Sequence, residues 1–233
     1  MPATCLLYYI TDRTAFSADE SIRRRRLLEK ICEAARSGVD YIQLREKDLP
    51  ACDLESLARE AVSVIRESSQ PTTEHRELRT ALLINSRTDV ALAVEAHGVH
   101  LRSDDVSPQE VRTVWRCGAG APSASSGQAP ARANSPRDAV IAVSCHSPTE
   151  VARAAASAAT FAVFAPVFEK RDVHPAGLKR LRESCEAKIP VLALGGITLA
   201  NAQSCFEAGA SGIAAIRLFQ DNDIATVVKQ LRG

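Results

Sequence analysis

Aromatic residues are scarce in this sequence, and neither sign of charge is in excess. Only 4% of the 233 residues are Phe, Trp or Tyr, so we expect Ala, Val, Leu and Ile to fill the core that a 45% apolar content makes possible. The formal net charge of +1 provides no overall field for binding nucleic acid or a membrane. Any anion-binding site must therefore be local.

Long apolar runs and paired cysteine motifs are also missing. No run approaches the ~20 residues of a membrane-spanning helix, and the start of the chain lacks a signal-peptide pattern. The seven cysteines are scattered without a Cys-x-x-Cys pair, which is typical of reduced thiols. We therefore expect a cytoplasmic protein without a membrane or nucleic-acid partner, and the sequence leaves a homo-oligomer open.

Four consecutive arginines, Arg23 to Arg26, are the one basic block that invites a nucleic-acid interpretation. They fall within a helical pattern, so they point all round a helix, and no aromatic residues for base stacking are interleaved with them. A solvated helix face is the favoured interpretation.

Short apolar runs typical of strands alternate with amphipathic helical patterns along the chain. We predict strands at 6–10, 41–45, 81–85, 98–101, 140–144, 161–164, 191–194 and 212–216. We predict helices at 21–37, 54–65, 88–95, 108–115, from Ser147 onward, and at 178–187, 199–208 and 224–231.

Strict alternation of strands and helices implies a parallel sheet. Eight such pairs in a chain of this length predict a single-domain α/β fold, a (β/α)8 TIM barrel over residues 1–233. An open doubly wound sheet is the alternative, but it would concentrate polar residues at one switch point. Here polar or glycine residues follow nearly every strand, which favours the barrel.

A low-complexity insert interrupts this pattern at residues 117–138. Its composition is dominated by Ala, Ser, Pro and Gly, which predicts a linker with almost no core residues. Because it follows a helix and precedes a strand, we place it on the barrel face opposite the active site.

The segment from Gln43 to Lys47 follows an apolar strand without an intervening turn residue. Side chains alternate along a strand, so Gln43, Arg45 and Lys47 share one face while Leu44 and Glu46 share the other. Two cations and an amide on one face must meet solvent, carboxylates or an anionic ligand, because burying them unpaired is costly.

In a barrel, the residues that follow the strands converge on one mouth. This set is Gln43, Arg45, Lys47, Asn85, His100, Asp105, Ser144, His146, Lys170, Gly195, Gly196 and Arg217. The four cations, a glycine turn and an acidic pair together suggest a phosphorylated or pyrophosphorylated small molecule with a metal ion.

Each member of this set also has a plainer interpretation. Gly195 and Gly196 free the backbone to approach a phosphate, or simply form a tight turn. Asp104 and Asp105 could bind Mg2+ or cap a helix. His146 could transfer a proton or merely hydrogen-bond its loop.

Several motifs give a specific resemblance. The segments Gln43 to Asp48, Leu83-Ile84-Asn85 to Gly98-Val99-His100, Val143 to His146, Ala165 to Phe168, Gly177-Leu178, and Ile189-Pro190-Val191 to Thr198 occur in the order and spacing of thiamine phosphate synthases. The chain also resembles the related TenI proteins, some of which are thiazole tautomerases. The resemblance covers nearly the whole chain outside the insert.

The resemblance implies a barrel enzyme that joins hydroxymethylpyrimidine pyrophosphate to thiazole phosphate and releases pyrophosphate. It implies that Arg45, Lys47, His146 and Lys170 act in catalysis. The residues that we predict to bind substrate are Gln43, Arg45, Lys47, Asn85, Ser144, Lys170, Arg171, Gly195, Gly196 and Arg217. Mg2+ is the implied cofactor, with Asp105 as a ligand.

This chain departs from the synthase pattern at the metal and at the thiazole phosphate. Ser86 stands where the synthases usually have a second Asp ligand, so the metal site here pairs Ser86 with Asp105. After the sixth strand, Glu169-Lys170-Arg171 replaces a longer run with two threonines, and Arg217 replaces a serine. Arginine forks can bind phosphate in place of hydroxyl groups.

Two further functions remain open on the sequence. A TenI-like tautomerase would use His146 as acid and base, and a non-catalytic barrel would bind a phosphate ester without turnover. Metal dependence separates the synthase from the tautomerase.

Overall fold

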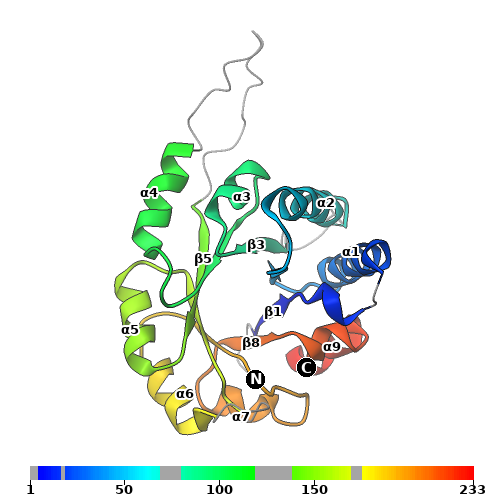
Figure 1. Cartoon of the computed structure of the whole chain (residues 1–233). Coiled ribbons are helices and arrows are strands. Elements are labelled where there is room, and N and C mark those ends of the chain that lie inside the picture. The colour runs from blue at the N-terminus through cyan, green and yellow to red at the C-terminus, as the bar shows by residue number, and fades with distance from the viewer. Residues whose placement is uncertain (1–4, 17–18, 69–79, 119–137, 169–174) are drawn as a thin grey trace, which may run out of the picture.

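Parallel strands pair in chain order, and β8 returns to pair with β1, which closes a barrel (Figure 1). The computed structural model describes residues 5–16, 19–68, 80–118, 138–168 and 175–233. The strands are β1 (Leu6–Ile10), β2 (Tyr41–Leu44), β3 (Ala81–Asn85), β4 (Gly98–Leu101), β5 (Val140–Cys145), β6 (Phe161–Phe164), β7 (Val191–Ala193) and β8 (Gly212–Ala215).

Helices follow the strands and form the outer layer around the barrel (Figure 1). They are α1 (Glu20–Arg36), α2 (Ala51–Ser68), α3 (Thr88–Ala93), α4 (Pro108–Gly118), α5 (Pro148–Ala156), α6 (Gly177–Cys185), α7 (Ala202–Glu207), α8 (Arg217–Gln220) and α9 (Ile224–Arg232). A short 3-10 helix, η1 (Arg13–Ala15), lies between β1 and α1. No helix in the described part of the chain is long and apolar enough to cross a bilayer.

Side-chain caps define where several helices begin. Asp19 accepts a hydrogen bond from the Ile22 N–H at the start of α1, and Asp223 does the same for Thr226 at α9. Ser147 caps α5, with Pro148 in the first turn, as the sequence predicts. Each cap satisfies a backbone donor that the helix itself leaves unpaired.

The predicted (β/α)8 barrel is confirmed, and the open-sheet alternative is wrong because β1 and β8 pair directly. For most elements, the observed first and last residues differ from the predicted ones by a few positions. The sequence did not predict η1 or α8. The predicted helix at 199–208 is shorter in the structure, where Leu199 to Asn201 form a turn ahead of α7.

Three aromatic residues meet inside the barrel, whereas the expected Ala, Val, Leu and Ile side chains make up most of the layer between the strands and the helices. Tyr8 packs edge-on against Phe161 with ring centroids 5.5 Å apart, and Tyr41 lies 4.7 Å from Phe161. Ile10, Leu83 and other inward-facing residues complete this inner cluster. Three large rings therefore fill space in the barrel interior that smaller side chains would leave empty.

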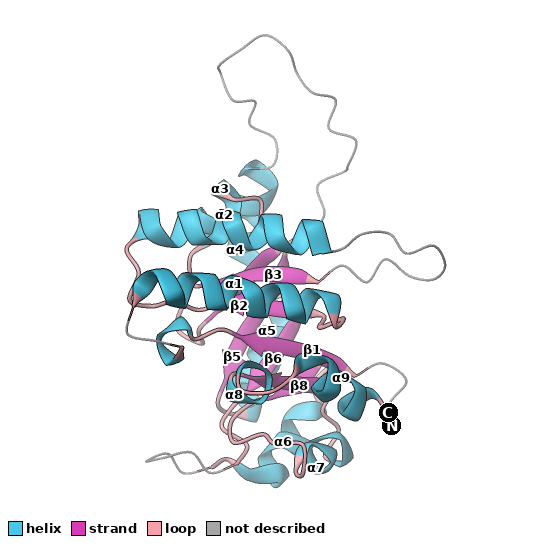
Figure 2. Cartoon of the chain, turned by 90° about the vertical axis from the view of Figure 1, so that its right-hand side faces the viewer, coloured by secondary structure: helices cyan, strands magenta, loops and turns pink. Residues whose placement is uncertain are grey.

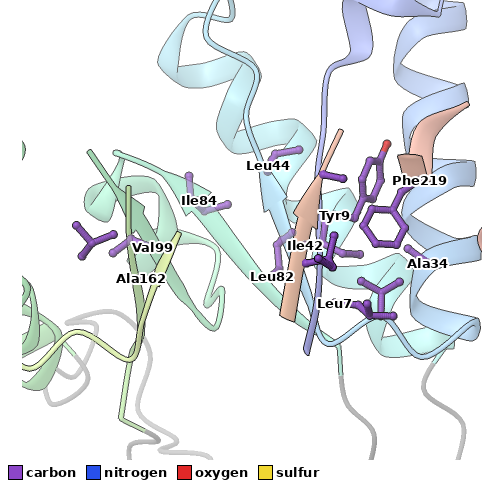
Figure 3. Packing of buried hydrophobic residues seen from close by; sticks show 14 of the residues in the cluster. Leu7, Tyr9, Ala34, Ile42, Leu44, Leu82, Ile84, Val99, Ala162 and Phe219 are labelled. Atoms are coloured by element: carbon purple, nitrogen blue, oxygen red, sulfur yellow. The ribbon is translucent and has the colours of Figure 1, made fainter. Parts of the chain in front are cut away.

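A second apolar cluster lies between the strands and the helices. Tyr9 packs against Phe219 with centroids 6.0 Å apart, and both lie beside Leu7 and Ala34 (Figure 3). Alternate residues of each strand thus face the barrel interior and the helix layer, so both faces of the sheet are buried.

The predicted insert at 117–138 begins later than expected, because α4 continues through Gly118. Residues 119–137 lie outside the described residues. The flanking elements are the end of α4 and the start of β5, which belong to the barrel end opposite the carboxyl ends of the strands.

Candidate active site

The amide side chains of β2 and β3 meet inside the mouth of the barrel. The Gln43 Nε2 donates a hydrogen bond to the Asn85 Oδ1 over 2.8 Å. Gln43 is only 2% exposed, whereas Asn85 is half-buried. The bond leaves the second N–H of Gln43 and the amide N–H2 of Asn85 as donors for a ligand at the mouth.

The loop after β2 carries the two predicted cations, and the end of β1 holds it in place. Arg45 is half-buried and Lys47 is exposed. The Arg45 N–H donates to the Thr11 Oγ1 over 3.0 Å, and the Thr11 hydroxyl donates to the Glu46 carboxylate over 2.5 Å. Thr11 therefore links the backbone of one loop residue to the side chain of the next.

Arg13 completes this anchor from the same side. Arg13 is 2% exposed, and its backbone N–H and Nη1 lie 3.0 and 3.3 Å from the Glu46 Oε2. Its Nη1 also lies 2.7 Å from the Asp48 Oδ1, and its Nε lies 2.8 Å from the Glu20 Oε1. One buried guanidinium thus contacts both ends of the segment 46–48 and the start of α1.

Burial and the neighbouring groups shift the pKa values of this cluster in opposite directions. Burial raises the pKa of Glu46, while hydrogen bonds from Thr11 and Arg13 oppose that shift. Although burial works against it, Asp48 and Glu20 raise the pKa of Arg13. A guanidinium does not lose its proton in proteins, so the cluster keeps a fixed cation behind the loop that carries Arg45 and Lys47.

The two residues predicted to share a metal ion, Ser86 and Asp105, lie in contact. The Ser86 hydroxyl donates to the Asp105 Oδ2 over 2.7 Å, and the Arg102 N–H donates to the same oxygen over 2.8 Å. The Arg102 Nε lies 3.3 Å from the Asp105 Oδ1. Although burial opposes them, the Arg102 N–H and the Ser86 hydroxyl lower the pKa of Asp105. A carboxylate that stays ionised is available to a cation.

A polar chain runs through the barrel interior to the mouth. The Tyr8 hydroxyl lies 3.0 Å from the His100 Nδ1, and the His100 Nε2 lies 2.7 Å from the Ser144 Oγ. Tyr8 and His100 are 0% and 2% exposed, and Ser144 is half-buried. Burial, with a smaller effect of Arg45, lowers the pKa of His100 to about 3, so its ring is neutral at neutral pH.

His146 is exposed at the end of β5 and is held by the next strand. Its Nδ1 lies 2.7 Å from the Ala165 carbonyl oxygen, and its backbone N–H donates to Glu150 over 2.7 Å. A carbonyl oxygen only accepts, so Nδ1 carries the proton. The Nε2 atom of His146 is then the ring position available to a ligand.

The glycine turn after β7 packs against the loop after β6. Gly195 has φ +101°, and a Cβ at this position would lie 2.8 Å from the Pro166 Cα. Gly196 has φ +65° and is exposed, and its carbonyl oxygen accepts a hydrogen bond from the Asn201 amide over 2.9 Å. Only glycine at 195 allows this close approach. Among the described residues no helix begins directly at this turn, because the helix predicted from residue 199 starts at Ala202.

Arg217 is exposed at the first position of α8. Gln220, at the other end of α8, accepts hydrogen bonds from the Tyr9 hydroxyl and the Asp12 N–H, and donates to the Asp12 carbonyl oxygen over 2.8 Å. The predicted site residues Lys170 and Arg171 lie outside the described residues.

Several residues that shape the site were not singled out from the sequence. They are Tyr8, Thr11, Arg13, Glu46 as an anchored carboxylate, and Gln220. The strand alternation already turned Glu46 away from Arg45, and a carboxylate turned toward a buried face needs a partner. That requirement could have directed attention to Arg13.

Among the described residues, no group of three or more His, Cys, Asp and Glu side chains could hold a metal ion. A hollow of about 630 Å³ lies on the outside of the barrel between α1 and α2, which run side by side in Figure 2. Arg24 in its lining donates to Glu60 over 2.7 Å. The strand ends, which carry the predicted set, lie elsewhere.

Comparison with known proteins identifies relatives over nearly the whole chain. The family model described as thiamine monophosphate synthase matches residues 7–119 and 124–219. The thiamine-phosphate synthase of Syntrophomonas wolfei is 33% identical over 97% of this chain and 94% of its own. That of Roseiflexus sp. is 33% identical over 91% of this chain and 76% of its own.

A solved structure gives the same result. The thiamine phosphate pyrophosphorylase from Pyrococcus furiosus superposes with a TM-score of 0.73 and is 27% identical. The match covers 99% of this chain and 95% of that one. Family and fold therefore agree.

Proposed function

This chain belongs to the thiamine monophosphate synthase family, and we propose that it joins hydroxymethylpyrimidine pyrophosphate to thiazole phosphate. The activity is a transferase reaction, as in the thiamine-phosphate synthases that it resembles. The TenI-type isomerase alternative is not needed to account for these relatives. Both substrates are phosphorylated small molecules, and because such anions do not cross a membrane unaided, we place the enzyme in the cytoplasm.

The reaction breaks one bond and forms another. The bond between the pyrimidine methylene carbon and the pyrophosphate oxygen breaks, and the pyrophosphate keeps the electron pair. The thiazole nitrogen then supplies its lone pair to the carbon and becomes a thiazolium. No proton is transferred, so the protein must stabilise charge on the leaving group and position the nitrogen.

The hydrogen bond between Gln43 and Asn85 at the barrel mouth is the observation that carries this proposal. It holds two amides beside the Arg45 and Lys47 loop, so that donors and cations meet at one place. Donors that are already oriented stabilise the developing charge without rearranging during the reaction. We assign Gln43, Arg45, Lys47 and Asn85 to the pyrophosphate.

The residues around Asp105 fit a Mg2+ ion that takes most of its ligands from substrate and water. Mg2+ commonly uses only one or two carboxylates in such sites, and Asp105 supplies one that is ionised and already oriented by Ser86. When bound, the ion would neutralise charge on the pyrophosphate. Ser86 then orients the carboxylate or adds a neutral oxygen ligand.

The thiazole phosphate is assigned to the opposite side of the mouth. The exposed Gly196 and the Arg217 guanidinium supply a backbone approach and a cation. Lys170 and Arg171, beyond the described residues, are assigned to the same phosphate from the loop after β6. Ser144 and the Nε2 of His146 are assigned to substrate contacts at the end of β5.

A covalent intermediate on Cys145 has no support. The thiol is 0% exposed, and burial raises its pKa to about 12, so it stays protonated and unreactive. This agrees with a reaction in which the protein supplies no nucleophile.

An assay with both precursors, with and without Mg2+, tests the function. We expect thiamine phosphate and pyrophosphate in equal amounts, and only with metal. Product formation without metal, or turnover of one precursor alone, would contradict the synthase mechanism. Retained binding of a phosphate ester without turnover would indicate a non-catalytic barrel.

Variants of the cations test the assignment of the site. Arg45→Ala and Lys47→Ala should each weaken binding of inorganic pyrophosphate about tenfold or more, with little effect on the fold. Arg59→Ala is the matched control, because Arg59 is an exposed α2 cation that pairs with Glu55 on the outside of the barrel. Equal pyrophosphate affinity in all three variants would show that the side chains of Arg45 and Lys47 lie on the surface without binding pyrophosphate.

A further inference from the structure

The buried Tyr8 and His100 pair is not explained by packing alone. Both side chains carry polar atoms into an interior otherwise filled by apolar residues. An aliphatic pair of similar volume would fill the same space without the cost of burying these groups. Among the described residues, the pair is linked toward the mouth by the contact of His100 with Ser144, which is half-buried near the carboxyl end of β5.

Two arrangements of protons fit the three heavy atoms. In the first, the Tyr8 hydroxyl donates to Nδ1, and the protonated Nε2 donates to the Ser144 Oγ. In the second, Nδ1 donates to the Tyr8 oxygen, and the Ser144 hydroxyl donates to Nε2. The distances of 3.0 and 2.7 Å are the same in both, so hydrogen-bond satisfaction must decide between them.

The second arrangement leaves the Tyr8 hydroxyl proton without an acceptor. Within the described part of the chain, His100 is the hydrogen-bond partner of this fully buried hydroxyl. A buried donor without a partner is destabilising, because it loses its hydrogen bonds to water and gains none in return. The first arrangement gives the Tyr8 hydroxyl proton and both ring nitrogens of His100 a partner, and it leaves the Ser144 proton, near the carboxyl end of β5, for a ligand.

We propose that Tyr8 and His100 are positioning residues that direct the Ser144 hydroxyl proton toward the barrel mouth. Ser144 then acts as an obligate hydrogen-bond donor. Its ligand must be an acceptor, and an oxyanion of the bound pyrophosphate fits best beside the cation of Arg45. This inference rests on the proposed function for the identity of the ligand, but the proton arrangement does not depend on it.

The proton arrangement can be measured without substrate. In protein labelled with 15N-histidine, long-range proton–nitrogen spectra distinguish a ring protonated at Nε2 from one protonated at Nδ1. We expect His100 to be protonated at Nε2 at neutral pH, with its signals assigned by their loss in His100→Gln. Protonation at Nδ1, or at both nitrogens, would overturn the proposal.

Tyr8→Phe removes the donor that fixes the ring. We expect the Nδ1-protonated form, absent in the parent, to become detectable in this variant. Tyr9→Phe is the matched control, because Tyr9 is a 0%-exposed tyrosine of the same strand whose hydroxyl donates to Gln220 on the other side of the sheet. It should leave the His100 signals unchanged, and a similar change in both variants would indicate a general loss of packing.

Affinity for inorganic pyrophosphate tests the role of the hydroxyl. We expect Ser144→Ala to weaken binding about tenfold and Tyr8→Phe about threefold. Tyr8→Phe should have no further effect in the Ser144→Ala background, because its route to the ligand is gone. Equal effects of Tyr8→Phe in both backgrounds would show a purely structural role and overturn the proposal.

These outcomes separate the inference from the proposed function. Protonation at Nε2 and coupled pyrophosphate affinities, without formation of thiamine phosphate, would support the positioning role and refute the synthase assignment. Failure of the parent to bind pyrophosphate would overturn the oxyanion as the ligand of Ser144.

Discussion

Arg13 and Glu46 form a buried ion pair between the ends of β1 and β2, with the Arg13 Nη1 3.3 Å from the Glu46 Oε2. Their side chains are 3% and 1% exposed. The pair lies next to the loop that carries Arg45 and Lys47, so the loop that we assign to the pyrophosphate depends on a buried charge for its position.

Loss of one partner should therefore be costly. Arg13→Ala leaves a buried carboxylate unpaired, and we expect the free energy of unfolding to fall by about 3–5 kcal/mol in urea denaturation. Arg24→Ala, which removes a partly exposed pair with Glu60, should cost no more than about 1 kcal/mol. A similarly small decrease in the free energy of unfolding of Arg13→Ala would mean that water reaches the Glu46 carboxylate in solution.

Because His100 is neutral in the folded protein, it makes the free energy of unfolding depend on pH over one range. Its pKa is lowered to about 3 in the folded protein, whereas an unfolded histidine titrates near 6.5. Between those values the unfolded chain binds one more proton than the folded chain. Stability therefore rises with pH from about 3 to about 6.5, and the contribution is complete above that range.

We expect this group to add a slope of up to about 1.4 kcal/mol per pH unit within the window. Urea denaturation from pH 7 to pH 4 should show this slope in the parent and lose it in His100→Gln. Parallel curves for the two proteins would indicate that His100 keeps an ordinary pKa.

The fold followed from the sequence because strand length, helix period and the order of elements are local signals. The mouth residues followed as well, since strand ends such as Asn85 and Ser144 can be placed without knowing distances. The partner of His100 could not be predicted, because Tyr8 contacts it across the barrel interior, and the need of Glu46 for a partner did not by itself identify Arg13. The short α8 also escaped prediction, since Gln220 holds it through contacts with β1 rather than through a helical pattern.

The position of the low-complexity insert gives a prediction about activity. Because α4 ends and β5 begins at the barrel end opposite the mouth, replacing residues 119–137 with a short Gly-Ser linker should leave kcat/KM within about twofold. Steady-state kinetics with both precursors would measure this. A tenfold or greater loss would contradict the placement of the insert away from the site.

The Ser86 hydroxyl lies 2.7 Å from the Asp105 Oδ2, so a carboxylate introduced at position 86 would lie beside Asp105. We assign Mg2+ to Asp105, substrate phosphates and water, and with a single carboxylate we expect the affinity for the ion to be reduced. We therefore expect Ser86→Asp to lower the half-saturating Mg2+ concentration about threefold to tenfold, because it adds a charged ligand. Asp105→Asn should nearly abolish turnover.

Added negative charge alone could attract Mg2+ without ligating it, so the effect needs a control for charge. Ser103→Asp adds the same charge on the loop that carries Asp105, but within the described residues the hydrogen-bond partners of Asp105 are Ser86 and Arg102, not Ser103. The gain in Mg2+ affinity should be specific to Ser86→Asp. It should appear in a calorimetric titration of Mg2+ in the presence of pyrophosphate, and also in the Mg2+ dependence of the rate. Like charges in contact raise the pKa of one carboxyl group, so the gain should be largest above neutral pH. If Ser86→Asp leaves both titrations unchanged while Asp105→Asn abolishes turnover, Asp105 acts on the pyrophosphate site through Arg102 rather than through a metal ion.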